Sequence, residues 1–514
     1  MARLCATVLL MSLVESILAA NCSIPPVYVD IHKRVVNGTD AFPYGSFIGV
    51  GNPFQNQSIW PSLRRNETSF ASSEFCSNSN LTNCMGSTGG NVKYNLSTSF
   101  KEDAHYSSKD SQDIASQSVK GTDDIHLYTH WFLTDSAFQT LADDAPVEFA
   151  NAGDTDPGIV GMGSSSTILE RLLQLNLIAA KTYSLYIGTG MERAGGVVNG
   201  SNTFGGYDAG RFKNPVHTYK MDLANSDYLP VTVTDITIDD PSNSDFKNKS
   251  IMDNGKSFEA RITTDRYPML FPSGVTKNFA HLLSAKSSDY SDNSLRLDKP
   301  FKGTMTIHIG DFKIKLPSSI VSNATNISPV QENDDDNYDG PFYLSTAFLT
   351  QVYLMLDFES SQFHLAEAYQ KNNYVIPTTF CPGTIPVPHN YNSGSAFLKQ
   401  GLIGAVVGGV IGGSAILTAL TMWFMFWRRN QYAKDQEKRW AAEDSAASSM
   451  FDDKKDIEME TLTPRSKQSL WGARQATPKK VFKLPFDDHE AEDDGWENTD
   501  THYGGRGINR GDDI

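Results

Sequence analysis

Short stretches in which apolar and polar residues alternate recur between residues 31 and 368. Residues 229–238 alternate with a period of two, which predicts a half-buried β-strand. Residues 304–309 and 311–316 lie on either side of a tight turn at Gly310, and this pattern predicts a β-hairpin. A strong helical pattern occurs in residues 166–179, where one face carries Ile168, Leu172, Leu175 and Ile178. We therefore expect a mainly β region that forms one large domain or two.

Two longer apolar segments flank this region. Arg3, an apolar run at residues 4–14 and the small residues Ala19 and Ala20 are typical of a secretory signal peptide, which we place at residues 1–20. Residues 401–427 form a stretch of 27 residues without a charge, more than the roughly 20 that cross a bilayer. Two arginines follow this stretch, so we expect a single transmembrane helix with a cytosolic C-terminus.

Potential N-glycosylation sites agree with this type I topology. All of them precede the apolar segment, as expected of a lumenal or extracellular region. We therefore expect a single-pass membrane protein of the cell surface (plasma membrane) or of a vacuolar or other endomembrane. The candidate asparagines are Asn21, Asn37, Asn56, Asn66, Asn80, Asn95, Asn199, Asn248, Asn323 and Asn326.

The remaining segments have compositions of their own. Residues 371–400 contain four prolines, and we interpret them as an extended stalk. Residues 428–514 are polar and highly charged, so we expect a disordered cytosolic tail. Within the apolar segment, Gly404, Gly408 and Gly412 recur at four-residue spacing, which is compatible either with a homodimer of close-packed helices or with ordinary glycine usage in membrane spans.

The chain carries 44 basic and 60 acidic residues, a formal net charge of -16, which argues against a nucleic-acid-binding protein. We expect no metal site either. His126 and His130 have helical zinc spacing but lie in a strand-like run, where four residues cover about 13 Å. The acidic run at residues 332–336 matches no calcium-loop signature, and we interpret it as a solvated loop.

Four glycine-rich or apolar segments occur in an order that is characteristic of one family. Residues 45–55 end in Gly-Asn-Pro-Phe-Gln, and residues 158–163 read Gly-Ile-Val-Gly-Met-Gly just before the expected helix. Residues 204–208 read Phe-Gly-Gly-Tyr-Asp, and residues 342–368 contain two apolar runs. Together these segments resemble the pepsin-like aspartic proteases, and the architecture is similar to membrane-anchored members from filamentous fungi.

The resemblance implies a bilobal, mainly β pepsin-like acid protease fold without a cofactor. We place the N-terminal lobe at residues 21–215 and the C-terminal lobe at residues 216–370. Family catalysis needs one aspartate from each lobe, each presented in an Asp-Thr/Ser-Gly triplet, so that two carboxyl groups share a proton. This chain contains neither triplet. Family spacing places the two triplets at residues 62–64 and 263–265.

Ser62 and Thr263 therefore stand at the positions of the two catalytic aspartates. A hydroxyl does not ionise in the acidic range, so neither residue supplies a general base, and we expect no catalytic residue. Three further cleft-associated positions depart from the family or lie near the motif: Arg64 replaces a glycine, Asp265 lies two positions beyond the expected aspartate, and Ser345 replaces another glycine. Residues 120–131 also lack the family's Tyr-led Gly hairpin over the cleft.

After removal of the signal peptide four cysteines remain, which allow three pairings. The family often has a small disulfide just after its first motif, which implies Cys76–Cys84. The N- and C-terminal segments meet in the sheet that joins the lobes, so the resemblance makes Cys22–Cys381 feasible.

Three functional hypotheses follow. The first is a non-catalytic pseudopeptidase whose cleft binds a peptide or a wall polysaccharide, or serves as a scaffold or sensor. The second is an active aspartic-type endopeptidase anchored in a membrane. The third is a structural glycoprotein or adhesin without peptide binding.

Overall fold

A computed structural model describes residues 22–36, 42–79, 81, 84–103, 105, 117–129, 138–153, 158–241, 246–371, 375–390, 418–432 and 434–442. The contacts divide the chain into two compact units, with the boundary between His389 and Asn390. The expected signal peptide, the glycine repeat Gly404, Gly408 and Gly412, and the tail beyond residue 442 lie outside the described residues.

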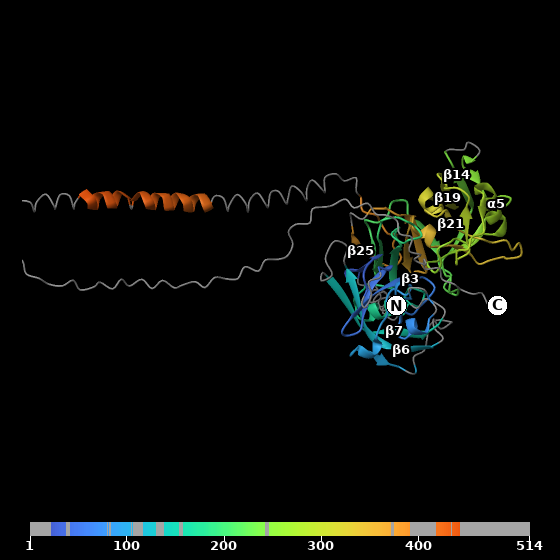
Figure 1. Cartoon of the computed structure of the whole chain (residues 1–514), viewed down its shortest axis with the longest axis horizontal. Helices are drawn as coiled ribbons and strands as arrows, with labels where there is room; N and C mark the ends of the chain where they lie inside the picture. The colour runs from blue at the N-terminus through green and yellow to red at the C-terminus, as the bar shows by residue number, and fades with distance from the viewer. Residues whose placement is uncertain are drawn as a thin grey trace, which may run out of the picture. The chain divides into compact units, whose positions relative to one another are not determined.

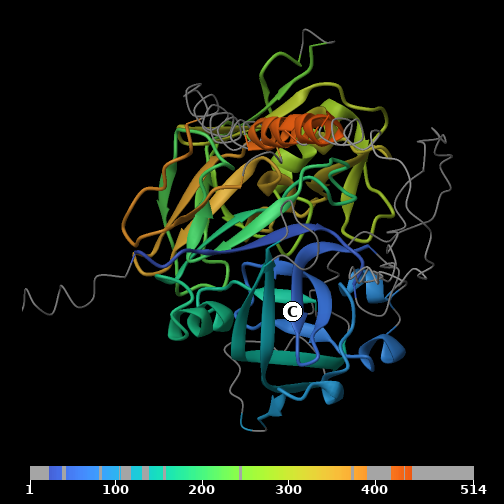
Figure 2. The same ribbon diagram turned by 90° about the vertical axis from the view of Figure 1, so that its left-hand side faces the viewer.

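The first unit is mainly β, as the alternating pattern predicts, and its largest sheet has 13 strands. Strands of the first lobe lie at one end of this unit and strands of the second lobe at the other (Figures 1 and 2). The order in the sheet is β12-β24-β23-β9-β10-β1-β2-β3-β8-β4-β7-β6-β5. The strands are β1 (Val27–Lys33), β2 (Tyr44–Val50), β3 (Gln55–Ser62), β4 (Ser69–Ala71), β5 (Lys101–Glu102), β6 (Gln117–Thr129), β7 (Phe138–Ala152), β8 (Ile159–Gly161), β9 (Thr182–Tyr186), β10 (Gly200–Phe204), β12 (His217–Lys220), β23 (Val352–Asp357) and β24 (Gln362–Glu367).

The second lobe adds three smaller sheets. The expected hairpin is confirmed, because β19 and β20 pair antiparallel around Gly310. The expected single strand at 229–238 is instead two strands in different sheets, because the Thr234 amide turns to His308 O (2.8 Å). The orders are β13-β16-β22, β15-β14-β19-β20 and β17-β18-β21. The strands are β13 (Pro230–Val233), β14 (Asp235–Asp239), β15 (Lys249–Ser250), β16 (Phe258–Ile262), β17 (Ala285–Lys286), β18 (Ser294–Leu297), β19 (Thr304–Ile309), β20 (Phe312–Leu316), β21 (Ile327–Gln331) and β22 (Phe342–Leu344).

Helices are short. The expected helix at 166–179 is α4 (Thr167–Gln174), which Ser166 caps by accepting a hydrogen bond from the Leu169 amide. It ends early because Asn176 adopts a left-handed conformation with φ of 53°. The helix α5 (Ser273–Leu283) is not evident from the sequence pattern. The other helices are α2 (Phe75–Asn78), α3 (Cys84–Ser87), η1 (Tyr94–Leu96), α6 (Ser318–Val321) and α7 (Thr346–Leu349).

The segment after the second lobe corrects the expected stalk at residues 371–400. β25 (Pro377–Thr379) pairs with β11 (Gly206–Asp208), and the side chain of Phe380 is fully buried. The His389 amide donates a hydrogen bond to Ala209 O at 2.7 Å. Apolar burial and backbone pairing therefore hold this segment on the first unit as far as His389, and residues 391–400 lie outside the described residues.

The described part of the second unit is helical at residues 418–432 and 434–442. Its large apolar side chains are exposed, among them Trp423, Phe424, Phe426 and Trp427. Residues 401–417 of the expected transmembrane segment lie outside the described residues. In the part of the chain that the structure describes, no helix is both long enough and apolar enough to cross a bilayer.

Candidate functional site

Two parallel strand pairs end next to residues 62–64 and 263–265. In the first lobe β3 pairs with β8, and Ser62 lies opposite Gly161 at the end of β3. In the second lobe β16 pairs with β22, and Thr263 follows directly after the last pair, Ile262 with Leu344. The backbone bonds continue past both pairs, from the Met162 amide to Ser62 O (2.8 Å) and from the Thr263 amide to Leu344 O (3.0 Å). The two lobes therefore present their triplets in equivalent ways.

The two triplet loops contact each other across the lobes. The Leu63 amide donates to Thr264 Oγ1 at 3.0 Å, so the middle residues of the two triplets meet. The indole Nε1 of Trp60 donates to Thr264 O at 2.8 Å, and Thr346 Oγ1 donates to the same carbonyl at 3.1 Å. Because Leu63 has no hydroxyl, the side-chain bond between the middle residues runs in one direction only.

Asp265 lies between Ser62 and Thr263. Its Oδ1 accepts a hydrogen bond from Ser62 Oγ at 2.5 Å, and its Oδ2 accepts one from Thr263 Oγ1 at 3.1 Å. The Asp265 amide in turn donates to Thr263 Oγ1 at 3.1 Å. All three residues are buried, with Asp265 only 9% exposed. One carboxyl group therefore links Ser62 and Thr263 through their hydroxyls.

Both side-chain oxygens of Asp265 are in contact with hydroxyl groups. A shared-proton pair requires two carboxyl groups in contact, because one must act as base while the other acts as acid. Within the described residues, the side-chain hydrogen bonds of Asp265 go to the Ser62 and Thr263 hydroxyls. Each carboxylate oxygen therefore already accepts one hydrogen bond, and these come from alcohols that do not ionise in the acidic range.

The other cleft-associated residues surround this centre. Arg64 is half-buried, and its neighbour Arg65 donates its amide to Ser62 Oγ at 3.1 Å. Ser345 is fully buried, and its Oγ donates to Tyr267 O at 2.5 Å, which joins the final strands to the second triplet loop. Burial raises the pKa of Tyr343, which also donates to Asp227, while the charges of Arg266 and Arg64 act in the opposite direction.

Sequence patterns gave no sign of Arg193, which links the lobes beside the site. It lies between β9 and β10, and its guanidinium pairs with Asp292 of the second lobe at 2.5 Å. The same guanidinium lies 4.5 Å from the ring centroids of both Tyr267 and Tyr290. Arg193 O also accepts a hydrogen bond from Tyr267 Oη at 3.1 Å. Tyr267 lies two residues after Asp265, so this buried cation supports the second triplet loop.

The region expected to lack the family's cleft hairpin forms a strand of the large sheet in the first lobe. Residues 120–129 belong to β6, which pairs along its length with β7 and at residues 125–127 with β2. His126 is in this strand, and His130 lies outside the described residues. Among the described residues, no group of three or more His, Cys, Asp or Glu side chains is arranged to hold a metal ion.

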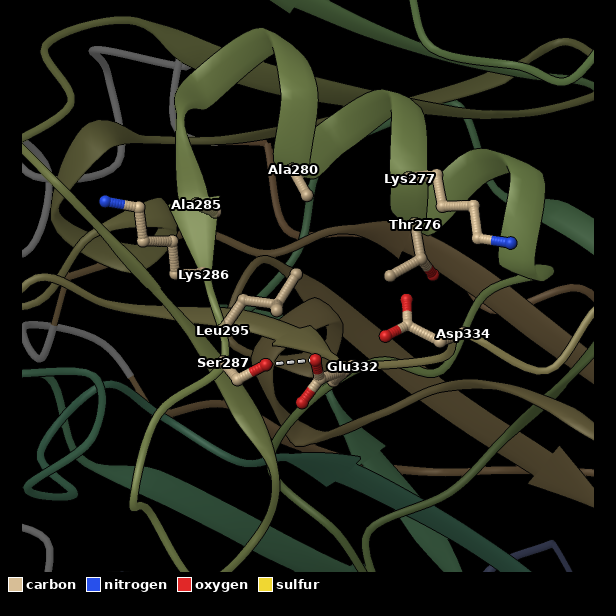
Figure 3. A pocket seen from close by; sticks show the side chains of 9 residues that line it. All are labelled: Thr276, Lys277, Ala280, Ala285, Lys286, Ser287, Leu295, Glu332 and Asp334. Carbon is tan, nitrogen blue, oxygen red and sulfur yellow. Dashed lines mark hydrogen bonds between the residues drawn. The ribbon is translucent and has the colours of Figure 1, made fainter.

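A pocket of about 320 Å³ lies in the second lobe, next to α5 (Figure 3). Three of its charged groups have partners: Glu332 accepts the Ser287 hydroxyl, Lys286 pairs with Asp298 at 3.1 Å, and Lys277 pairs with Asp336 at 2.6 Å. Two residues of the acidic run at 332–336 thus have partners: Glu332 accepts a hydroxyl hydrogen bond, and Asp336 pairs with a lysine. The pocket is lined by Thr276, Lys277, Ala280, Ala285, Lys286, Ser287, Leu295, Glu332 and Asp334.

The structure contains disulfide bonds, as expected, and they join Cys22 to Cys381 and Cys76 to Cys84. The candidate glycosylation sites differ in exposure. Asn95, Asn199 and Asn248 are exposed, and Asn56, Asn66, Asn323 and Asn326 are half-buried. Asn21, Asn37 and Asn80 lie outside the described residues.

Comparison with known proteins agrees with the fold. No curated protein matches the chain. A family model described as eukaryotic aspartyl protease matches residues 77–368, which is more than half of the 514 residues. The matched region contains Thr263, Asp265 and Ser345 and begins after Ser62. The chain therefore belongs to the eukaryotic aspartyl protease family.

Proposed function

We propose that this protein is a non-catalytic member of the eukaryotic aspartyl protease family that binds an extended peptide between its lobes without cleaving it. The observation that carries the proposal is the single carboxylate of Asp265, held by the hydroxyls of Ser62 and Thr263. These two hydroxyls stand where the resemblance to pepsin-like proteases places the catalytic aspartates.

The chemistry that would be lost is large. General acid-base catalysis by a positioned group contributes about 10²–10⁴-fold to a rate, and the family mechanism uses two such groups. A water molecule next to Asp265 would meet one carboxylate whose two oxygens already accept hydrogen bonds. No second carboxyl group would be available to protonate the leaving amine. The peptide bond would therefore stay intact in the complex.

The proposal of a peptide ligand rests on the fold, in which two lobes meet at the paired triplet loops. A wall polysaccharide bound in the same place, or a purely structural role, is the competing outcome. The sensor or scaffold role requires only that binding be retained while cleavage is absent.

We also propose that the chain is a type I membrane glycoprotein anchored by residues 401–427. Three features support this: the uncharged run of 27 residues, the two arginines after it, and ten candidate glycosylation sites that all precede it. Exposed aromatic side chains at residues 423–427 also suit a membrane interface. Full-length protein that resists extraction by alkaline carbonate would support the anchor, and release into the soluble fraction would contradict it.

The test of function uses full-length protein, purified in detergent from a eukaryotic secretory host. We would incubate it at about pH 4 with a library of random octapeptides, recover the protein-bound fraction, and identify the peptides by mass spectrometry. The proposal expects enrichment of intact peptides. Cleaved peptides would contradict the non-catalytic assignment, and no enrichment would contradict peptide binding and favour the polysaccharide or structural role.

One observation favours an active endopeptidase as the second candidate: a buried carboxylate is retained at the centre of the site. If Asp265 takes part in catalysis, its replacement by Asn should abolish acid-dependent cleavage. Under our proposal the Asp265→Asn variant and the parent protein both leave the peptides intact.

A further inference from the structure

An aromatic surface on the outer face of the first lobe has no part in the site. Phe54, in the turn between β2 and β3, is 52% exposed although it is a large apolar residue. Its ring centroid lies 5.4 Å from that of His126 and 6.2 Å from that of Tyr128. Leu141 on the neighbouring strand is 44% exposed. We call these four residues the aromatic platform.

Strand pairing places Asn56 beside this platform. Asn56 is the second residue of β3 and follows directly after the turn that carries Phe54. Asn56 pairs with Gly49 of β2, and Gly49 pairs with His126 of β6 on its other edge. His126 in turn lies opposite Leu141 of β7. Asn56 and the platform therefore share one outward face across four strands.

Gly49 keeps this face open. A Cβ at Gly49 would lie 2.7 Å from the Tyr128 hydroxyl and 3.2 Å from Asn56 Oδ1, so a side chain there would displace the Tyr128 hydroxyl. The glycine thus lets Tyr128 lie across β2 toward Asn56. On this face the ring of Phe54 is exposed, Asn56 and His126 are half-buried, and Tyr128 is buried.

We propose that Asn56 carries an N-linked glycan whose first N-acetylglucosamine packs on the aromatic platform. Asn56-Gln57-Ser58 is a glycosylation sequon, and its asparagine is half-buried rather than fully enclosed. One face of a pyranose ring presents C–H groups, which pack well on the electron-rich face of an aromatic ring. The first sugar thereby covers the exposed ring of Phe54 and stabilises the first lobe.

This inference rests on the lumenal placement in the proposed function, because the chain is glycosylated only if it enters the secretory pathway. Ser58 is fully buried and donates to Pro43 O at 2.9 Å in the folded protein. The glycan must therefore be attached before β3 is packed. Glycosylation of the emerging, unfolded chain meets this condition.

The test begins with glycopeptide mass spectrometry of full-length protein from a eukaryotic secretory host. Asn95, which is exposed in η1, is the matched reference site. We expect Asn56 to be occupied. Occupancy of Asn95 without occupancy of Asn56 would overturn this inference and leave the lumenal placement intact. The absence of glycan from every sequon would overturn both.

The second part measures the coupling between glycan and ring by thermal unfolding. We expect Asn56→Gln and Phe54→Ser each to lower the Tm by about 2 °C, while Asn95→Gln leaves it unchanged. In the Asn56→Gln background, Phe54→Ser should lower the Tm less than half as much. Equal effects of Phe54→Ser in both backgrounds would overturn the packing.

Enzymatic trimming separates the first sugar from the rest of the glycan. An endoglycosidase that leaves a single N-acetylglucosamine on each asparagine should preserve the Tm. An amidase that removes the whole glycan should lower it by the same amount as Asn56→Gln. If trimming to one sugar has the same effect as complete removal, the first N-acetylglucosamine is not the stabilising group.

Discussion

The hydrogen bond between Ser62 and Asp265 should make a measurable contribution to the stability of the protein. Ser62 Oγ donates to Asp265 Oδ1 at 2.5 Å, and it also accepts the Arg65 amide at 3.1 Å. Hydrogen bonds to charged groups contribute about 1.5–3 kcal/mol to stability, and a buried acceptor left without a donor adds to the loss. We therefore expect Ser62→Ala to lower the free energy of unfolding by about 2–3 kcal/mol.

A matched variant separates this charged bond from an ordinary one. Ser184 is also fully buried, and its Oγ lies 2.7 Å from the neutral hydroxyl of Tyr353. Ser184→Ala should therefore cost only about 1 kcal/mol. In an Asp265→Asn background, where the acceptor is neutral, the cost of Ser62→Ala should fall to a similar value.

The assay is urea unfolding of the full-length chain, followed by tryptophan fluorescence. Trp60 donates to Thr264 O at 2.8 Å, so it reports on the triplet loops. The predicted coupling between Ser62 and Asp265 in the double-mutant cycle is about 1 kcal/mol or more. A coupling below about 0.5 kcal/mol, or a Ser62→Ala cost no greater than that of Ser184→Ala, would refute the structural role of this carboxylate.

Three further predictions concern stability, each read from unfolding of the full-length chain. Arg193→Met removes the ion-pair partner of the buried Asp292 carboxylate and should lower the free energy of unfolding by about 3–5 kcal/mol. A loss below about 1 kcal/mol would exclude a stabilising link between the lobes through this ion pair. Burial lowers the pKa of His364 to about 4, below its ordinary value near 6.5, so the unfolded chain binds more protons and stability falls as the pH drops through this interval. The loss should reach about 3 kcal/mol at pH 4, and His364→Gln should remove it, whereas an unchanged pH dependence would contradict the assignment. Removing the Cys22–Cys381 disulfide, which spans 359 residues, should cost up to about 5 kcal/mol, against about 2.5 for the disulfide that spans 8. Equal losses of stability would mean that the length of the closed loop does not determine how much each disulfide contributes.

The sequence predicts the β architecture because alternation and turn residues are local signals. The hairpin at Gly310 and the start of α4 at Ser166 follow from such signals. The helix α5 does not, because Gly274 and Thr276 are weak helix formers, and burial of Val275 and Phe279 in the second lobe stabilises it instead.

The C-terminal segment shows the same limitation. Its prolines predict an extended backbone, and β25 is indeed extended, but proline content does not reveal that β11 provides a partner strand. The pairing joins segments about 170 residues apart, as the 168-residue separation between Asp208 and Ile376 shows. No local pattern carries that information.

The site divides in a similar way. Family spacing predicts that residues 62–64 and 263–265 face each other, and the Leu63–Thr264 hydrogen bond joins them. The bridging role of Asp265 depends on a contact across 203 residues, so its position in the triplet alone could not reveal it. Arg193 belongs to no motif, and only its contacts with Asp292, Tyr267 and Tyr290 show its role.

The central claim is that one carboxylate, held by two hydroxyls, replaces a catalytic pair. The most direct measurement is the rate of peptide-bond cleavage by the purified full-length protein between about pH 4 and pH 5, with and without pepstatin, beside an active pepsin-family enzyme. Thermal unfolding at the same pH verifies that the protein is folded. We predict a rate no greater than that of the Asp265→Asn variant and no response to pepstatin. Cleavage that pepstatin inhibits and that Asp265→Asn abolishes would contradict the account.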